Sequence, residues 1–100
     1  MELKWTSKAL SNLARLYDFL VLTSKPAAAR TVQSLTQAPV ILLTHPRMGE
    51  RLFQFEPREV RWIFAGEYEI RYEFNGQTIY VLRLWHTREN RWIVCGDNLT

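Results

Sequence analysis

The chain has 100 residues, of which 47% are hydrophobic and 23% charged, and its formal net charge is +3. This length and apolar content predict one folded domain with a modest core and exclude a disordered chain. No apolar run approaches the roughly 18 residues that a membrane-spanning helix needs, and the N-terminus lacks the pattern of a secretory signal. Neither a membrane partner nor secretion is therefore expected.

Arginine dominates the basic residues, because only Lys4, Lys8 and Lys25 among the 13 are lysine. The planar guanidinium suits carboxylates and phosphates, as an acidic protein partner or an RNA backbone would provide. Arginines on an ordinary protein surface with no binding role are the equally weighted alternative. The single cysteine, Cys95, cannot form an internal disulfide and fits a reducing cytosol. Two histidines and one cysteine do not make a metal-ligand set, so no cofactor is expected.

The first half of the chain predicts a short strand followed by two helices. Apolar and polar residues alternate over 2–5, and Thr6 or Ser7 can cap a helix that runs to about Leu22. A second helix begins near Pro26 and, by its apolar spacing, extends to about Thr44. Pro39 lies inside this second helix and predicts either a kink or two shorter helices.

The second half predicts strands. Residues 51–58 are irregular, and residues 59–64 form a strand with Val60, Trp62 and Phe64 on one face. A long hairpin follows over 68–88, where Asn75-Gly76 predicts a two-residue type I′ turn that pairs Phe74 with Gln77 and Tyr68 with Arg83. The residues predicted on its apolar face are Ile70, Tyr72, Ile79, Val81 and Trp85. Those predicted on its solvent face are Glu69, Arg71, Glu73 and Thr78, although Leu82 and Leu84 make that face mixed.

The predicted element order is β-α-α-β-β-β, which indicates an α+β fold with a helical hairpin packed on an antiparallel sheet. We expect one domain over residues 1–90 and a C-terminal tail over 91–100. The tail contains Trp92-Ile93-Val94, which can add an edge strand, dock on the domain or remain loose.

Several segments, in this order, resemble the RelE/ParE superfamily of toxins from type II toxin–antitoxin modules. The segments are Trp5-Thr6 before Ala9-Leu10 and Leu13, His45-Pro46-Arg47-Met48-Gly49, Arg58-Glu59-Val60-Arg61, Gly66 to Tyr72, and Arg83 to Arg88. The resemblance spans residues 3–88. It implies a cytoplasmic toxin that a cognate ParD-like or related antitoxin neutralises, with operator DNA contacted only through the antitoxin.

Within the superfamily, the ending His86-Thr87-Arg88 is more similar to ParE-like toxins, which inhibit DNA gyrase, than to RelE-like ones. The segment over residues 31–82 carries five arginines but six glutamates, which makes a poor surface for RNA. We therefore expect a gyrase inhibitor without catalytic residues. The residues expected to bind the antitoxin are Arg61, Arg71, Arg83, Arg88 and Trp62.

The alternative is a RelE-like ribosome-dependent mRNA endonuclease, with ribosome and mRNA as partners. Such an enzyme must activate a 2′-hydroxyl, stabilise the transition state and protonate the leaving oxygen. Its catalytic residues would be Arg61, Arg83, His86 and Arg88, with His86 as acid or base. A degenerate toxin with no activity is a third hypothesis, because Trp62 stands where the family pattern commonly has a basic residue.

Each of these residues also has a structural interpretation. His86 beside Trp85 suits a hydrogen-bonded histidine, and Arg83 suits stacking on Tyr68 or pairing with Glu67. Arginines 58, 61 and 71 alternate with glutamates and suit cross-strand ion pairs, each of small energy. Trp62 shares a face with Val60 and Phe64, which suits burial in the core as well as an exposed contact surface.

Overall fold

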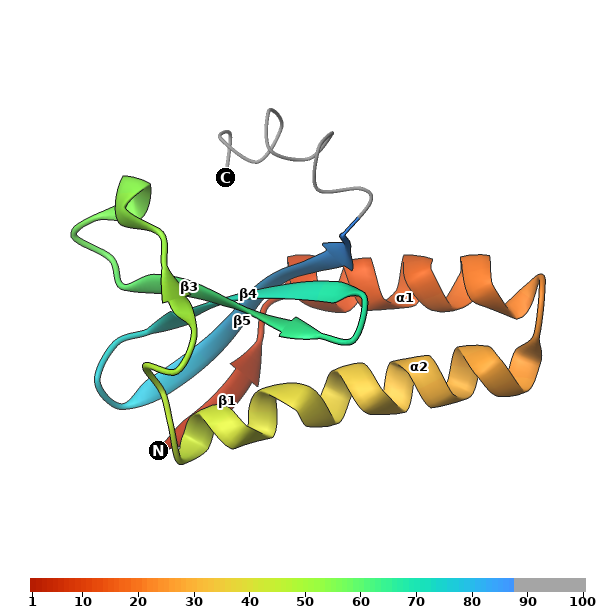
Figure 1. Ribbon diagram of the computed structural model, residues 1–100, viewed down its shortest axis with the longest axis horizontal. Coiled ribbons are helices and arrows are strands. Elements are labelled where there is room, and N and C mark those ends of the chain that lie inside the picture. Colours follow the sequence, from red (N-terminus) through yellow and green to blue (C-terminus); the bar gives the residue numbers. More distant parts are fainter. Residues whose placement is uncertain (88–100) are drawn as a thin grey trace.

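The computed structural model describes residues 1–87, so the predictions on Arg88, on a domain boundary at residue 90 and on the tail lie outside the described residues. The described chain forms a five-stranded sheet with two α-helices packed against it (Figure 1). The elements are β1 (Glu2–Trp5), α1 (Ser7–Val21), α2 (Lys25–Gln37), the 3-10 helix η1 (Ala38–Leu43), β2 (Glu50–Arg51), the 3-10 turn η2 (Phe53–Phe55), β3 (Val60–Ala65), β4 (Tyr68–Phe74) and β5 (Thr78–His86).

The sheet has the strand order β1-β5-β4-β3-β2. The first strand lies parallel to the last one, whereas the other neighbours are antiparallel, so the sheet is mixed. The predicted α+β fold with a helical hairpin on a sheet is confirmed. The structure differs from the prediction in two strands. β1 pairs in parallel with β5, so the sheet is not wholly antiparallel, and the two-residue β2 was not predicted; both pairings join segments that are separated in sequence.

The first helix begins at the predicted cap, Thr6, and the second begins at Lys25, next to the predicted Pro26, with Ser24 as a cap that was not predicted. The Thr6 hydroxyl accepts the N–H of Ala9, and the Ser24 hydroxyl accepts that of Ala27, so each helix has a side-chain N-cap. Pro39 ends the regular part of the second helix, and the chain continues as the 3-10 helix η1. No helix in residues 1–87 combines the length and the apolar content needed to cross a membrane.

The core lies between the helical hairpin and one face of the sheet. Its buried members are Ala9, Leu35, Leu42, Ile63, Ile70, Tyr72, Phe74, Ile79, Val81 and Leu84. Burial of each large apolar side chain contributes about 1.5–3 kcal/mol, so this cluster is the main source of stability. Helices with apolar residues on one stripe can cover only one sheet face, and the other face carries Val60, Trp62 and Phe64 instead.

The predicted register of the β4–β5 hairpin is wrong. Phe74 pairs with Ile79 rather than with Gln77, and residues 75–77 connect β4 to β5. The Asn75 side-chain oxygen accepts the backbone N–H groups of Gln77 and Thr78, and only Gly76 in this loop has a positive φ. A type I′ turn needs positive φ at both central residues, so the side-chain hydrogen bonds of Asn75 stabilise a different turn.

A register shift within the hairpin changes which side chains face the helices. Tyr72 pairs with Val81 but Arg71 pairs with Arg83, so β5 has one extra residue there, Leu82. Beyond this bulge the alternation is reversed. Leu84 is therefore 2% exposed in the core, and Trp85 lies on the opposite face, opposite Glu69.

The predicted solvent face of β4 is likewise wrong at two positions, because Glu69 and Arg71 are 9% and 8% exposed.

Candidate functional site

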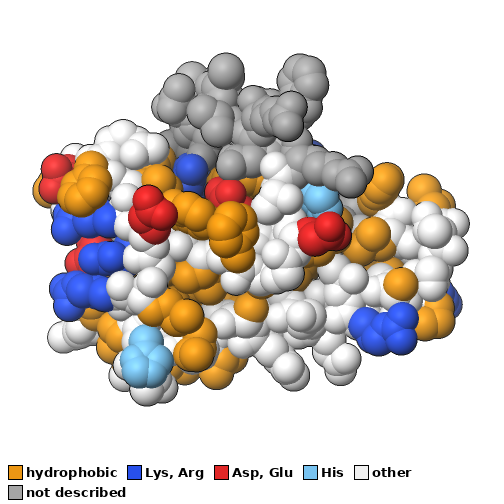
Figure 2. All heavy atoms as spheres, in the orientation of Figure 1, with side chains coloured by type: hydrophobic (Ala, Val, Ile, Leu, Met, Phe, Trp, Pro, Cys, Tyr) orange, Lys and Arg blue, Asp and Glu red, His pale blue; other side chains and the backbone are white. Residues whose placement is uncertain are grey.

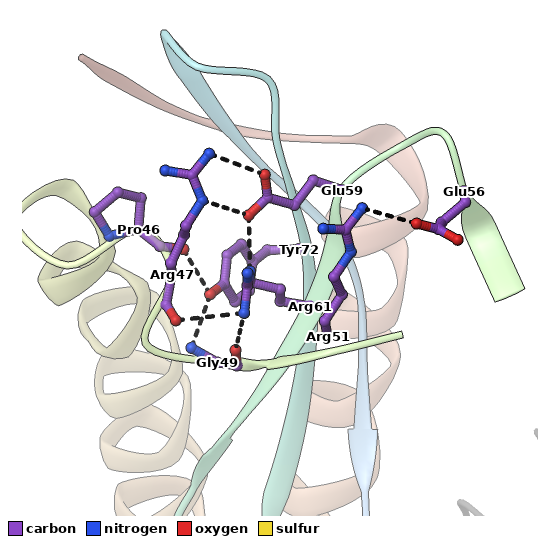
Figure 3. Close-up of polar contacts among 8 residues, drawn as sticks. All are labelled: Pro46, Arg47, Gly49, Arg51, Glu56, Glu59, Arg61 and Tyr72. Atoms are coloured by element: carbon purple, nitrogen blue, oxygen red, sulfur yellow. Dashed lines mark hydrogen bonds and ion pairs between the residues drawn. The ribbon is translucent and has the colours of Figure 1, made fainter. Parts of the chain in front are cut away.

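A polar network, which we call the loop anchor, fixes the loop between η1 and β2 to the sheet (Figure 3). Its members are Pro46, Arg47, Gly49, Glu59, Arg61 and Tyr72. The Tyr72 hydroxyl donates to the Pro46 carbonyl oxygen at 2.8 Å and accepts the Gly49 N–H at 3.0 Å. Burial raises the pKa of Tyr72, although the hydrogen bond from Gly49 acts in the opposite direction.

Only glycine fits at position 49 in this arrangement. A Cβ there would lie 2.6 Å from the Trp62 carbonyl oxygen and 2.8 Å from the Tyr72 hydroxyl oxygen. Both distances are far inside van der Waals contact, and the first obstacle is backbone that cannot rotate away. The glycine thus permits the loop to lie directly against β3 and β4.

Arg61 is held from two sides within the loop anchor. Its Nε donates to Glu59 Oε2 at 2.8 Å, and its Nη1 donates to the Gly49 carbonyl oxygen at 2.7 Å. Arg47 donates twice to the same carboxylate, at 2.9 and 3.2 Å. Burial opposes ionisation of Glu59, but the hydrogen bonds from Arg61 and Arg47 outweigh it and lower the pKa of this carboxyl. The side chain of Arg61 is 15% exposed, so it serves mainly to fix the loop.

Charges at this end of the molecule are mostly paired. Arg58 donates to Glu73 at 2.7 Å, and Arg51 lies 3.4 Å from Glu56. In the face drawn in Figure 2, basic and acidic side chains alternate at the left end, while hydrophobic side chains occupy its centre. Such exposed pairs contribute little stability individually.

A second cluster, the arginine pocket, lies between the start of α1, the η2 region and strands β4 and β5. Its volume is about 310 Å³, and its lining residues are Thr6, Ser7, Lys8, Phe55, Arg58, Arg71, Leu82 and Arg83. The Thr6 hydroxyl donates to the carbonyl oxygens of Val81 and Leu82, which fixes the start of α1 beside β5. The pocket is therefore formed by the start of α1, the η2 region and the β4–β5 hairpin, which are distant from one another in sequence.

Arg71 and Arg83 are direct cross-strand partners in this pocket. The Arg71 guanidinium lies between two aromatic rings, 5.1 Å from the ring centre of Phe55 and 5.1 Å from that of Trp85. Burial lowers the pKa of Arg71, the charge of Glu69 opposes this, and the charge of Arg83 adds to it. Two like charges at opposed positions repel each other, and both guanidinium groups contribute positive charge to this side of the sheet.

Arg83 is tied to the first helix through Asn12. Its Nε donates to the Asn12 side-chain oxygen at 3.3 Å, and the same oxygen accepts the Leu84 N–H at 3.2 Å. The suggested stacking of Arg83 on Tyr68 is wrong, because Tyr68 pairs with His86 after the register shift.

His86 and Trp62 lie outside the arginine pocket. The His86 Nε2 is 3.7 Å from a carboxylate oxygen of Glu67, and its ring meets that of Tyr68 edge to face at 5.2 Å. Trp62 is half-buried on the sheet face away from the helices, with its ring 4.7 Å from that of Phe64, which is 59% exposed. Trp62 is therefore neither a member of the core nor a fully exposed side chain.

The structure thus separates the predicted residues. It brings Arg71 and Arg83 together, places Arg61 in the loop anchor and leaves His86 beside Glu67, while Arg88 lies outside the described residues. Lys8, Arg58 and Phe55 also line the pocket, but they were not predicted as site residues, because no periodicity or motif in the sequence connects them with β4 and β5. The hydroxyl of Tyr72 also went unnoticed, since its alternation indicated only a core side chain.

The arginine pocket is suited to binding an anion. Its lining side chains in the described part of the chain include guanidinium, ammonium and hydroxyl groups but no histidine or carboxylate. Nor do three metal-ligating side chains come together anywhere in residues 1–87. The geometry therefore points to recognition of a negatively charged group.

Comparison with known proteins adds two findings. The family described as "ParE toxin of type II toxin-antitoxin system, parDE" matches residues 3–91. Among solved structures, the chain is similar to one described as "Chromosomal ParDE TA system from P. aeruginosa", with 27% identity and a TM-score of 0.72 over 86% of this chain and 95% of that one. No protein of curated function matches significantly.

Proposed function

This chain belongs to the family of ParE toxins of type II toxin–antitoxin systems, and on that premise we propose that it inhibits DNA gyrase in the cytoplasm. The family match over residues 3–91 is the observation that carries the proposal. The separation of His86 from the arginine pocket supports inhibition by binding, because among the described residues no histidine or carboxylate lines that pocket.

The second part of the proposal is neutralisation by a ParD-like antitoxin, through which the pair also contacts operator DNA. The solved relative is described as a ParDE system. An acidic and apolar antitoxin segment, disordered when free, would fold onto the toxin. The exposed apolar side chains of Phe19, in the last turns of α1, and of its C-cap residue Leu22 offer apolar contacts for such a segment.

Within this interface we assign carboxylate contacts to Arg83, with Arg71 beside it on the next strand. Trp62 and Arg88 are the further residues that we expect to bind the antitoxin. Arg61 acts indirectly, because Glu59 and the Gly49 carbonyl already hold its guanidinium. Arg83→Glu should weaken the complex by more than about tenfold, measured by calorimetry with the antitoxin encoded beside the toxin gene. Arg30→Glu, the same charge change at an exposed position on α2, is the control. Unchanged affinity in Arg83→Glu would refute this assignment.

The gyrase proposal is tested with two reactions run side by side on purified toxin. We expect loss of gyrase supercoiling with accumulation of cleaved DNA, and intact mRNA in a translation reaction. His86→Ala should retain full gyrase inhibition, because His86 contacts Glu67 and Tyr68 rather than the pocket.

The RelE-like nuclease, with Arg61, Arg83, His86 and Arg88 as catalytic residues, remains the alternative, because a cationic pocket can also hold an RNA phosphate. Codon-spaced mRNA cleavage with unaffected gyrase, abolished in His86→Ala, would establish that alternative and reject gyrase inhibition. Inactivity in both reactions would instead indicate a degenerate toxin.

A further inference from the structure

Strand β1 forms one edge of the sheet, because β5 is its only neighbouring strand in residues 1–87. The N–H groups of Glu2 and Thr6 donate to backbone carbonyl oxygens in β5 and in the residue before it. Backbone groups of successive residues in a strand point to opposite sides, so those of Leu3 and Trp5 point away from β5. This outer edge can therefore form hydrogen bonds with a further strand.

The exposed side chains of β1 carry charges of opposite sign. Those of Glu2 and Lys4 are 70% and 53% exposed, and they lie on the sheet face away from the helices. Leu3 and Trp5 point to the other face and pack against the core. A lysine commonly protects an edge strand from pairing with another chain. Glu2, two residues before Lys4, removes this protection against a copy of the same strand, because each charge can face its opposite.

Two copies of β1 are complementary when they lie antiparallel with Leu3 opposite Leu3 of the second copy. Because the backbone groups of Leu3 point outward, this pair can exchange both of its hydrogen bonds. The next position on either side then places Glu2 opposite the second copy's Lys4, in the kind of pair where side chains come closest. The same register places Lys4 opposite the second copy's Glu2, as a two-fold interface requires.

The 3-10 helix η1 supplies apolar surface beside this edge. It contacts both β1 and β5, and its Leu42 belongs to the core, so it lies on the helix side of these two strands. Its Val40 and Ile41 are 49% and 47% exposed, and Met1, just before β1, is 58% exposed. A two-fold axis through paired edge strands brings η1 of both copies to the same side of the joined sheet, where these side chains can pack.

We infer that β1 pairs with β1 of a second copy of this chain, which joins the two sheets through this edge. Four-residue strands and a few apolar side chains make a small interface, below about 1,200 Å², so we expect a dissociation constant of about 10–100 µM. Arg71, Arg83 and Trp62, which we assign to the antitoxin, lie on strands β3 to β5. The inference therefore depends neither on that assignment nor on gyrase as the target.

Analytical ultracentrifugation of the full chain from about 1 to 500 µM, at constant ionic strength, tests this pairing. We expect a reversible equilibrium between monomer and dimer. Lys4→Glu and Glu2→Lys each place like charges opposite one another, so each should weaken dimerisation more than about tenfold. An equimolar mixture of the two variants places every glutamate opposite a lysine and should dimerise at least as tightly as the unmodified chain.

Arg30→Glu, which reverses an exposed charge on α2, is the control and should leave dimerisation unchanged. Glu2 and Lys4 are both exposed, so their substitution should preserve the fold, and urea denaturation checks this. A monomer at every concentration, equal weakening in Arg30→Glu, or no recovery in the mixture would overturn the inference. A monomeric chain in which Lys4→Glu weakens antitoxin binding would also overturn it, and would assign this edge to the antitoxin.

Discussion

The loop anchor and the arginine pocket use the same residue type in opposite ways. In the loop anchor, Arg47 and Arg61 share the Glu59 carboxylate, and Arg61 also reaches the Gly49 carbonyl. In the arginine pocket, Arg71 and Arg83 stand directly opposite each other across two strands. The first arrangement shares one carboxylate between two arginines, and the second places two arginines opposite each other across the hairpin.

The difference shows that arginine content alone does not locate a binding site. Arg61 and Arg71 lie on neighbouring strands and both alternate with glutamates in the sequence. Their roles diverge because Arg61 lies on the sheet face that meets the loop after η1, whereas Arg71 lies on the other face, where η2 and β5 contribute Phe55 and Trp85. Mutations in the loop anchor should change stability, and mutations in the arginine pocket should change anion binding, so the two kinds of variant test this difference.

The largest effect on stability is expected from Gly49→Ala in the loop anchor. The added Cβ would lie 2.6 Å from the Trp62 carbonyl oxygen, so the loop must move away from β3. We expect a loss of about 2–3 kcal/mol in the free energy of unfolding, measured by urea denaturation. Gly76→Ala, in the exposed hairpin loop with open space around its Cβ, is the comparison that isolates the steric cause from strain at positive φ. A smaller loss in Gly49→Ala than in Gly76→Ala would contradict this explanation.

Tyr72→Phe should have the next largest effect. It retains the ring in the core but removes the hydroxyl that accepts the Gly49 N–H and donates to the Pro46 carbonyl oxygen. Leaving these backbone groups without their partner should cost about 1–3 kcal/mol in the free energy of unfolding. Tyr80→Phe, on the same hairpin but half-buried, controls for loss of a phenolic hydroxyl. Equal effects of the two substitutions would reject the loop anchor as a stabilising network.

The third prediction compares the two clusters directly. Arg61→Gln should lower the free energy of unfolding by about 1–2 kcal/mol, because it removes bonds to Glu59 and Gly49. Arg83→Gln should change it by no more than about 0.5 kcal/mol, since the lost bond to Asn12 is offset by relief of repulsion with Arg71. Urea denaturation of both variants under the same conditions measures these changes. A larger loss in Arg83→Gln than in Arg61→Gln would contradict the different roles assigned to the two arginines.

The smallest expected effect is a pair of opposed pH dependences. The lowered pKa of Glu59 means that its contribution to stability is complete above the unfolded-state pKa, near 4.5, and is lost as pH falls through the lower folded-state value. Burial raises the pKa of Glu69, although Arg71 opposes this, so its contribution is complete below that pH and is lost as pH rises through the folded-state value.

Unfolding curves of both Glu→Gln variants between about pH 3 and pH 7 measure these slopes. Glu59→Gln should reduce the loss of stability on acidification, and Glu69→Gln should reduce the loss toward neutral pH. Shifts of the same sign in the two variants would contradict the assigned causes.

Local sequence signals determined much of the fold. The cap at Thr6, the helix break at Pro39 and the alternation of β4 act within a few residues, so the elements and the α+β class follow from sequence alone. The residues also carried the resemblance to the RelE/ParE superfamily. Arg71 and Arg83 were among the residues expected to bind a partner, because arginine in a strand hairpin suits anions.

The tertiary structure decided register, sheet face and charge pairing. Hydrogen bonds to the Asn75 side-chain oxygen and the bulge at Leu82 set the hairpin register. As a result, Trp85 lies on the same sheet face as Arg71 and not on the predicted apolar face. Arg61 bonds the Gly49 carbonyl oxygen in a loop 12 residues earlier in the chain, and Asn12 meets Arg83 across 71 residues. Such contacts form only when distant segments pack together, so residue spacing could not show that Arg61 fixes a loop while Arg71 and Arg83 line a pocket.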